Sequence, residues 1–151
     1  MRRSIQISAA VILATCAAAL ALWQWDAPRN RIELLLERGT IEQRARAYLN
    51  AEMEHNNKQV YAYLAPSSTY RKTHSYEQFI QDVNGTAVKI KSYKIVDIYR
   101  LRDNDTNEYL AVSRFVQVEV AVDIAFEDTG LQSTCNYCFT FLKEGGTWYK
   151  G

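Results

Sequence analysis

The feature that most constrains this chain is an uncharged run at its N-terminus. Arg2 and Arg3 open the sequence, and no charged residue occurs from Ile5 to Trp25. A helix of about 20 apolar residues crosses the roughly 30 Å hydrocarbon core of a bilayer, and tryptophans at the end of such a run suit the membrane interface. The sequence therefore predicts a transmembrane anchor or signal segment over residues 5–25, after a cytoplasmic tip of residues 1–4.

Other interpretations of this run stay open. A cleaved signal peptide has the same basic start and apolar middle, and Ala19-Leu20-Ala21 matches its small-x-small cleavage pattern. A lipoprotein anchored at Cys16 is disfavoured, because Thr15 fits the lipidation sequence poorly and the apolar run continues past the cysteine. A buried core helix is also disfavoured, since no face of the run carries a polar stripe.

The charges that flank the run predict its orientation. Arg2 and Arg3 favour a cytoplasmic start under the positive-inside rule, although Arg29 and Arg31 on the far side weaken this bias. We therefore expect a single-pass protein of the cell membrane whose soluble domain lies on the extracytoplasmic, periplasmic side. Residues 26–39 would form a juxtamembrane stalk between the membrane segment and the soluble domain.

Composition narrows what the soluble part can do. The chain has 151 residues, 48% of them hydrophobic, which suits one domain with a proper core. The formal net charge of +1 provides no basic field for nucleic acid. With two His and three Cys at spacings unlike those of ligand sets, we expect no metal and no cofactor.

Helical patterns occupy the first half of the domain. Thr40 and Gln43 match a capping box, which predicts a helix from Ile41 to about His55 after an interruption at Gly39. Asn57 could cap a second helix ending near Leu64, before Pro66. The third helix would run from Tyr76 to Val83, opened by a capping box at Ser75 and Gln78 and closed by Asn84-Gly85 in a left-handed turn.

A two-residue periodicity replaces the helical one after Gly85. Strand patterns cover residues 88–101, 115–126 and 131–141, and a last strand begins at Thr147. Thr129-Gly130 and Glu144-Gly145-Gly146 have the composition of hairpin turns. Helices followed by antiparallel strands with one apolar face predict an α+β fold, with helices packed on one side of a curved sheet.

This order of elements resembles the nuclear transport factor 2-like superfamily, the cystatin-like α+β cone. The likeness covers residues 40–151 and depends on Tyr63-Leu64-Ala65-Pro66 leading to Tyr70-Arg71, on the short third helix, and on the closing Gly146-Thr147-Trp148-Tyr149-Lys150. It implies a cone whose members include ketosteroid isomerases, dehydratases, polyketide cyclases, secretion-system subunits and non-catalytic accessory domains. A fold shared by so many activities does not decide among them.

Cys135 and Cys138 form the most conspicuous local motif. Residues three apart in a strand face opposite sides, about 10 Å apart, which exceeds disulfide reach. A disulfide would therefore need a bulge at Asn136-Tyr137, although an exported domain is under oxidising pressure. Free or structural cysteines, a bulge disulfide, and a redox or zinc role all stay open.

Aromatic side chains are the candidates for ligand binding. Tyr48, Tyr61, Tyr99 and Phe139 combine apolar area with hydroxyl groups that could orient a guest in the cone, and core packing is the alternative. Asp97 would be the general base of an enzyme if it shared an inner face with Tyr93, Ile95 and Tyr99. If Val96 and Ile98 take that face, Asp97 lies in solvent.

The remaining candidates have simpler explanations. His55 would stabilise the end of the first helix through the helix dipole, and His74 would lie in a polar loop. The polar sheet face could bind a second copy or a partner, or could simply be solvated; it carries Gln117, Glu119, Asp123, Asn136, Cys138 and Thr140.

Three functional hypotheses follow. The first is a non-catalytic, membrane-anchored extracytoplasmic domain for interaction or assembly. The second is a small-molecule binding cone for an apolar or lipid-derived guest, and the third is an isomerase- or dehydratase-like enzyme.

Overall fold

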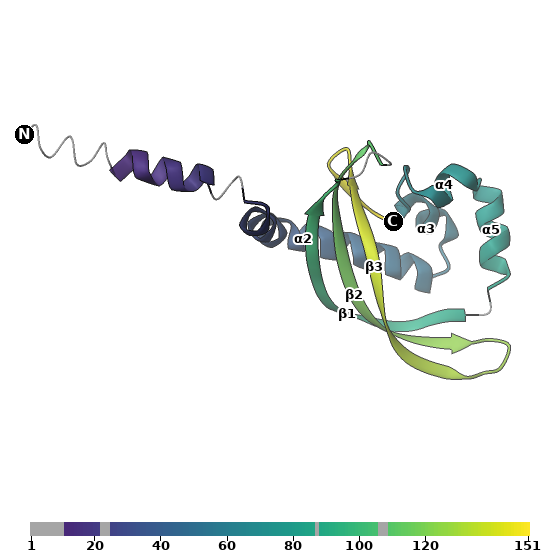
Figure 1. The fold of residues 1–151 in the computed structure, drawn as a ribbon. Helices are drawn as coiled ribbons and strands as arrows, with labels where there is room; N and C mark the ends of the chain where they lie inside the picture. The colour runs from purple at the N-terminus through teal and green to yellow at the C-terminus, as the bar shows by residue number, and fades with distance from the viewer. Residues whose placement is uncertain (1–10, 22–24, 87, 106–108) are drawn as a thin grey trace, which may run out of the picture. The chain divides into compact units, whose positions relative to one another are not determined.

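The computed structural model describes residues 11–21, 25–86, 88–105 and 109–151. The chain divides into two compact units, residues 1–36 and 37–151. Helix α2 (Asp26–Met53) contributes its first part to one unit and the rest to the other. Figure 1 shows the order of the elements along the chain.

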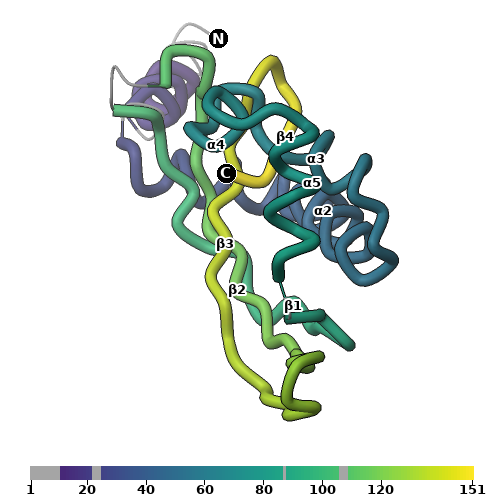
Figure 2. Tube along the Cα trace, turned by 90° about the vertical axis from the view of Figure 1, so that its right-hand side faces the viewer, coloured from purple at the N-terminus to yellow at the C-terminus, as the bar shows by residue number. Residues whose placement is uncertain are grey.

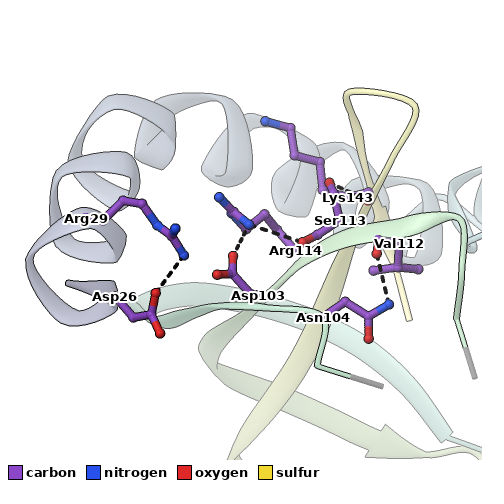
Figure 3. Close-up of polar contacts among 8 residues, drawn as sticks. All are labelled: Asp26, Arg29, Asp103, Asn104, Val112, Ser113, Arg114 and Lys143. Carbon is purple, nitrogen blue, oxygen red and sulfur yellow. Dashed lines mark hydrogen bonds and ion pairs between the residues drawn. The ribbon is translucent and has the colours of Figure 1, made fainter. Parts of the chain in front are cut away.

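The N-terminal unit contains the helix Val11–Ala21 and the start of α2. None of the helices in the described ranges is by itself long and apolar enough to cross a bilayer; Val11–Ala21 reaches that length and composition only together with α2. The other residues of the predicted segment, 5–10 and 22–24, lie outside the described ranges. In the first turn of α2, Arg29 forms an ion pair of 3.0 Å with Asp26 (Figure 3).

Helix α2 runs without interruption through Gly39, so the predicted break and the Thr40 capping box are wrong. A glycine inside a helix costs only about 1 kcal/mol, and the helix buries Ile41, Ala45 and Leu49 against the domain core. The predicted end of the helix is confirmed. His55 takes a left-handed φ of 53°, and the N–H of Asn56 donates to the carbonyl oxygen of Ala51 at 2.8 Å.

Three short helices follow: α3 (Asn57–Tyr63), α4 (Thr69–Thr73) and α5 (Tyr76–Asn84). The cap of α3 is Asn56 rather than Asn57. The capping box of Ser75 and Gln78 is confirmed in both directions, but Gly85 has a φ of −81°, so the predicted left-handed closure of α5 is wrong. Helix α4, capped by Ser68, was not predicted, because five residues carry no readable periodicity.

Four antiparallel strands form one sheet in the order β1 (Val88–Asp103), β2 (Val112–Phe126), β3 (Gln132–Glu144) and β4 (Thr147–Lys150). The strands curve, and α3, α5 and the second part of α2 lie on the concave side (Figures 1 and 2). The predicted alternation of β2 is confirmed. Its inner-facing side chains are fully buried: Val116, Val118, Val120 and Val122.

Strand β1 changes face along its length because its register with β2 shifts three times. Tyr93 and Ile95 pair with the inner-facing Val122 and Val120. After the shift that follows Ile95, Asp97 and Tyr99 pair with residues of the polar face, and Ile98 is buried in their place. The expectation that Asp97 and Tyr99 share the face of Tyr93 is therefore wrong, since a bulge reverses the alternation.

A partly buried group of polar side chains holds α2 to the C-terminal hairpin. The Nε1–H of Trp148 donates to Glu37 at 2.7 Å, and Lys143 also donates to this carboxylate. Burial alone would raise the pKa of Glu37, but the hydrogen bonds from Lys143 and Trp148 outweigh it and hold the pKa below its ordinary value. Glu37 therefore stays ionised and clamps α2 to the sheet.

The same end of the sheet carries further cross-strand contacts, which Figure 3 shows. Arg114 of β2 forms an ion pair with Asp103 of β1, and the hydroxyl of Ser113 donates to the carbonyl oxygen of Lys143 at 3.2 Å. The side chain of Asn104 donates to the carbonyl oxygen of Val112 at 3.0 Å. These contacts stabilise the end of the sheet to which Glu37 of α2 is bonded.

We expect Glu37→Gln to lower the free energy of unfolding by about 1–3 kcal/mol, because Lys143 would lose its charged partner. Since the folded pKa is lowered, the contribution of Glu37 is present above the unfolded value of 4.5 and disappears as pH falls through the folded value. Denaturant unfolding at several pH values measures both effects. Glu42→Gln is the control, because it removes only an exposed pair with Arg46; equal losses in the two variants would contradict the clamp.

Two glycine substitutions should shift stability in opposite directions. Gly39 lies inside a helix with open space where a Cβ would be, so Gly39→Ala should stabilise by about 0.5–1 kcal/mol. Gly146 has a φ of 81° in the turn between β3 and β4, so Gly146→Ala should destabilise by about 1 kcal/mol or more. Thermal unfolding of both variants tests this. A destabilised Gly39→Ala would show that α2 needs a break at this residue.

Candidate functional site

The C-terminal unit has a cleft of 220 Å³ where the end of α2, helices α3 and α5, and the first residues of β1 meet. Its polar lining residues lie toward the end of α2 and the start of β1: Glu52, His55, Asn57, Thr86 and Lys89. Its apolar lining residues come from α3, α5 and β1: Val60, Phe79, Val83, Val88 and Ile90. A cleft that combines apolar side chains with polar groups at its border can hold a small molecule.

Aromatic packing holds the helical wall of this cleft in place. Phe79 of α5 is buried, and its ring centroid lies 5.4 Å from that of Tyr61. The Tyr61 hydroxyl donates to the carbonyl oxygen of His74 at 3.0 Å, and the Arg71 guanidinium lies 4.8 Å from the Tyr61 ring centroid. Tyr61 therefore supports the wall from behind rather than lining the cleft.

A second group of polar side chains lies on the inner face of the sheet beside the cleft. Tyr48 is buried and packs edge-on against Phe139, with 6.3 Å between the ring centroids. Its hydroxyl donates a hydrogen bond to the carboxylate of Glu52. The Lys150 ammonium lies 6.0 Å from the centroid of the same Phe139 ring. Glu52 lines the cleft, so it connects this group to the cleft.

Burial shifts the pKa of two members of this group, Tyr48 and Lys150. Desolvation, with the negative charge of Glu52 and its hydrogen bond, raises the pKa of Tyr48 well above the ordinary value, so its hydroxyl keeps its proton. Desolvation lowers the pKa of Lys150, and the charge of Glu52 partly opposes that change. The group therefore offers a fixed hydroxyl, a carboxylate and a partly desolvated ammonium.

The structure thus brings together two of the four predicted ligand residues, Tyr48 and Phe139. Tyr99 lies on the opposite face of the sheet, where its hydroxyl is 3.2 Å from the Cys138 sulfur. Sequence reasoning missed Glu52 and Lys150 as site residues. Glu52 follows Tyr48 by one helical turn, a spacing that could have pointed to it, but no comparable signal marks Lys150.

Polar side chains on the outer face of the sheet bond in cross-strand pairs. The Cys138 thiol donates to Gln117 at 3.0 Å, and Asn136 donates to Glu119 at 3.1 Å. Thr134 donates to Asp123 at 2.6 Å. The Ser92 hydroxyl also donates to Asp123, and the two bonds lower the pKa of this exposed carboxyl. The predicted polar face therefore exists as an ordered layer.

The two cysteines of the Cys135–Cys138 motif lie on opposite faces of β3. Cys135 pairs with Val122 on the inner face and Cys138 with Glu119 on the outer face, in an unbroken register without the bulge that a disulfide would need. Both thiols are free in the structure. Within the described residues, no group of three or more His, Cys, Asp or Glu side chains could hold a metal ion.

The other titratable candidates lie apart from one another. His55 lines the cleft, whereas His74 lies in the predicted loop, directly after α4, and stacks on Tyr70 at 4.3 Å. Asp97 accepts a 3.1 Å hydrogen bond from Arg38 and is about half exposed. The structure therefore places Asp97 with the polar, outer face of the sheet.

Comparison with known proteins gives a likeness in fold. No family model matches the chain, and no curated protein matches its sequence. A solved structure of a ketosteroid isomerase-like protein from Erwinia carotovora atroseptica SCRI1043 is similar, with 18% identity and a TM-score of 0.48; the match covers 76% of this chain and 90% of that one. Nothing about the activity of this chain follows from a similarity of this degree.

Proposed function

We propose that this protein is a binding domain that holds a small apolar molecule in the cleft between α2, α3, α5 and β1. The observation that carries the proposal is the composition of the lining: apolar residues from three elements, with polar groups at the end of α2 and at the start of β1. Such a lining buries an apolar guest and orients its polar end.

The size of the cleft limits the guest. An apolar cavity of about 150 Å³ holds benzene, and this cleft measures 220 Å³. A single-ring molecule with one substituent is therefore the natural probe. A larger, lipid-derived guest would have to extend out of the cleft.

We further propose that segment 5–25 attaches this domain to the extracytoplasmic side of the cell membrane. The support is the uncharged composition of the segment after Arg2 and Arg3. In its described part, the large apolar side chains Val11, Ile12, Leu13 and Leu20 are all exposed. Burial of these side chains in lipid would remove that apolar surface from water.

Filling the cleft should abolish binding of an apolar probe. We expect the full-length chain in detergent micelles to bind 4-fluorotoluene and so to broaden the ¹⁹F resonance of this probe. Val83→Trp should weaken the affinity for the probe about fivefold or more, because the indole would occupy the guest's volume. Gln81→Trp is the matched control, since this exposed position on the same helix does not line the cleft. Equal broadening by all three proteins would overturn the proposal.

A second candidate function is interaction or assembly through the outer face of the sheet. The observation that favours it is the layer of cross-strand hydrogen bonds that fixes Gln117, Glu119, Asn136 and Cys138 in place. A fixed polar surface loses little side-chain entropy when a partner binds it. This function is compatible with a cleft on the other side of the sheet.

Crosslinking through Cys138 tests this face and the orientation together. In a chain with Cys16→Ser and Cys135→Ser, a membrane-impermeant bifunctional maleimide applied to intact cells should give a crosslinked species that Cys138→Ser removes. Thr140→Cys, on the same face, should restore it in that background, and Tyr137→Cys, exposed on the inner face, should not. A product that stays monomeric would contradict this function.

A further inference from the structure

The C-terminal unit has a second pocket, which borders the middle of α2 and is separate from the cleft. It measures 260 Å³, and its lining comes from α2 and from the last residue of α3: Thr40, Gln43, Arg44, Ala47 and Tyr63. None of these five residues lines the cleft described above. Occupation of the two sites can therefore be tested independently.

The spacing of the α2 residues explains how they come together. Positions 40, 43, 44 and 47 follow an i, i+3, i+4, i+7 pattern, which places side chains in one stripe along a helix. A neighbouring stripe of the same helix buries Ile41, Ala45 and Leu49 in the core. Because the packing of that apolar stripe fixes the rotation of α2, it also fixes the direction in which the pocket residues point.

The Tyr63 ring completes the pocket and holds the arginine. Leu64, the next residue, is buried and forms an isolated bridge with Lys150, which anchors the end of α3 to the sheet. The Arg44 guanidinium lies over the Tyr63 ring, with 5.3 Å between its Cζ and the ring centroid. A ring contact of this kind holds a guanidinium without using any of its five N–H donors.

The N–H donors of Arg44 have no acceptor. Among the residues that the structure describes, Arg44 has neither a hydrogen bond nor an ion pair, although its side chain is partly buried. Its neighbours differ, since Arg46 is paired with Glu42 and Arg71 donates to the carbonyl oxygen of Leu64 at 3.1 Å. Polar groups that leave water nearly always have a partner, so the Arg44 guanidinium is suited to the oxygens of a bound molecule.

The rest of the lining adds neutral donors and apolar surface. The Thr40 hydroxyl and the Gln43 amide can each donate to a guest, and within the described part of the chain neither side chain is bonded elsewhere. Ala47 and the Tyr63 ring supply the apolar surface. Arg44 is the one charged residue of the lining as described, so the pocket offers a single positive charge.

We infer that this pocket binds a small carboxylic acid as its monoanion, with Arg44 as the principal contact. The planar fork of a guanidinium matches the two oxygens of a carboxylate, and one negative charge balances the charge of Arg44. A phosphate dianion would leave one charge uncompensated in a partly desolvated site. The inference goes beyond the proposed function, because it concerns a different site and a different class of molecule.

Three probes with one fluorinated ring test this site: 4-fluorobenzoate, its neutral amide 4-fluorobenzamide, and 4-fluorophenyl phosphate. Their affinities for the full-length chain in one detergent can be measured by ¹⁹F titration at a mildly alkaline pH, where the phosphate is a dianion. We expect the benzoate to bind about tenfold or more tightly than the amide, because only the carboxylate forms a charge-assisted pair with Arg44. It should also bind more tightly than the phosphate.

Variants of α2 test the role of Arg44. Arg44→Gln should weaken the benzoate about tenfold or more, to the level of the amide, and Arg44→Lys, which keeps the charge but loses the fork, should recover only part of that affinity. Arg46→Gln is the matched control, since it removes the same charge at an exposed position of the same helix outside the pocket. Thermal unfolding of each variant shows whether it is folded.

The outcomes separate this site from the cleft. Equal losses in Arg44→Gln and Arg46→Gln, or equal affinities for the benzoate and the amide, would overturn the inference, and tighter binding of the phosphate would overturn the assignment to a carboxylate. Val83→Trp, which fills the cleft, should leave the benzoate affinity unchanged. Loss of benzoate binding in that variant would place the probe in the cleft, which overturns the second site while the proposed function stands.

Discussion

The packing of α2 across the inner face of the sheet is the constraint on which the domain depends. Glu37 fastens one end of the packed segment through Trp148 and Lys143, and Tyr48 with Glu52 lies at the other. Between them the helix buries its apolar stripe against the core. The cleft exists because α2 ends at Met53, before the left-handed His55, which leaves the sheet beyond that point to be faced by α3 and α5.

Much of this fold follows from local patterns in the sequence. The alternation of β2 and the capping box at Ser75 predict their elements correctly, because each is a property of a few adjacent residues. The continuity of α2 through Gly39 could not be predicted in this way. The bonds of Glu37 before the glycine and the burial of Ile41 after it compensate for its low helix propensity, and those contacts are tertiary.

The candidate site was only partly predictable for the same reason. The patterns of Tyr48 and Phe139 predict the inner faces of a helix and a strand, and the structure packs the two rings together there. Tyr99 was misplaced because register shifts in β1 are not visible as a break in the alternation. Lys150 was missed because its direction is set by the four-residue strand β4, whose register depends on the turn at Gly145 and Gly146.

The irregular register of β1 has a consequence for solubility. This strand of 16 residues forms one edge of the sheet, so its outer N–H and C=O groups could template another chain. Three shifts interrupt that row, and Arg100 adopts a left-handed φ of 55° within the last of them. Copies of the domain would thus be discouraged from polymerising edge to edge, and the lysines of the strand would repel one another across such a contact.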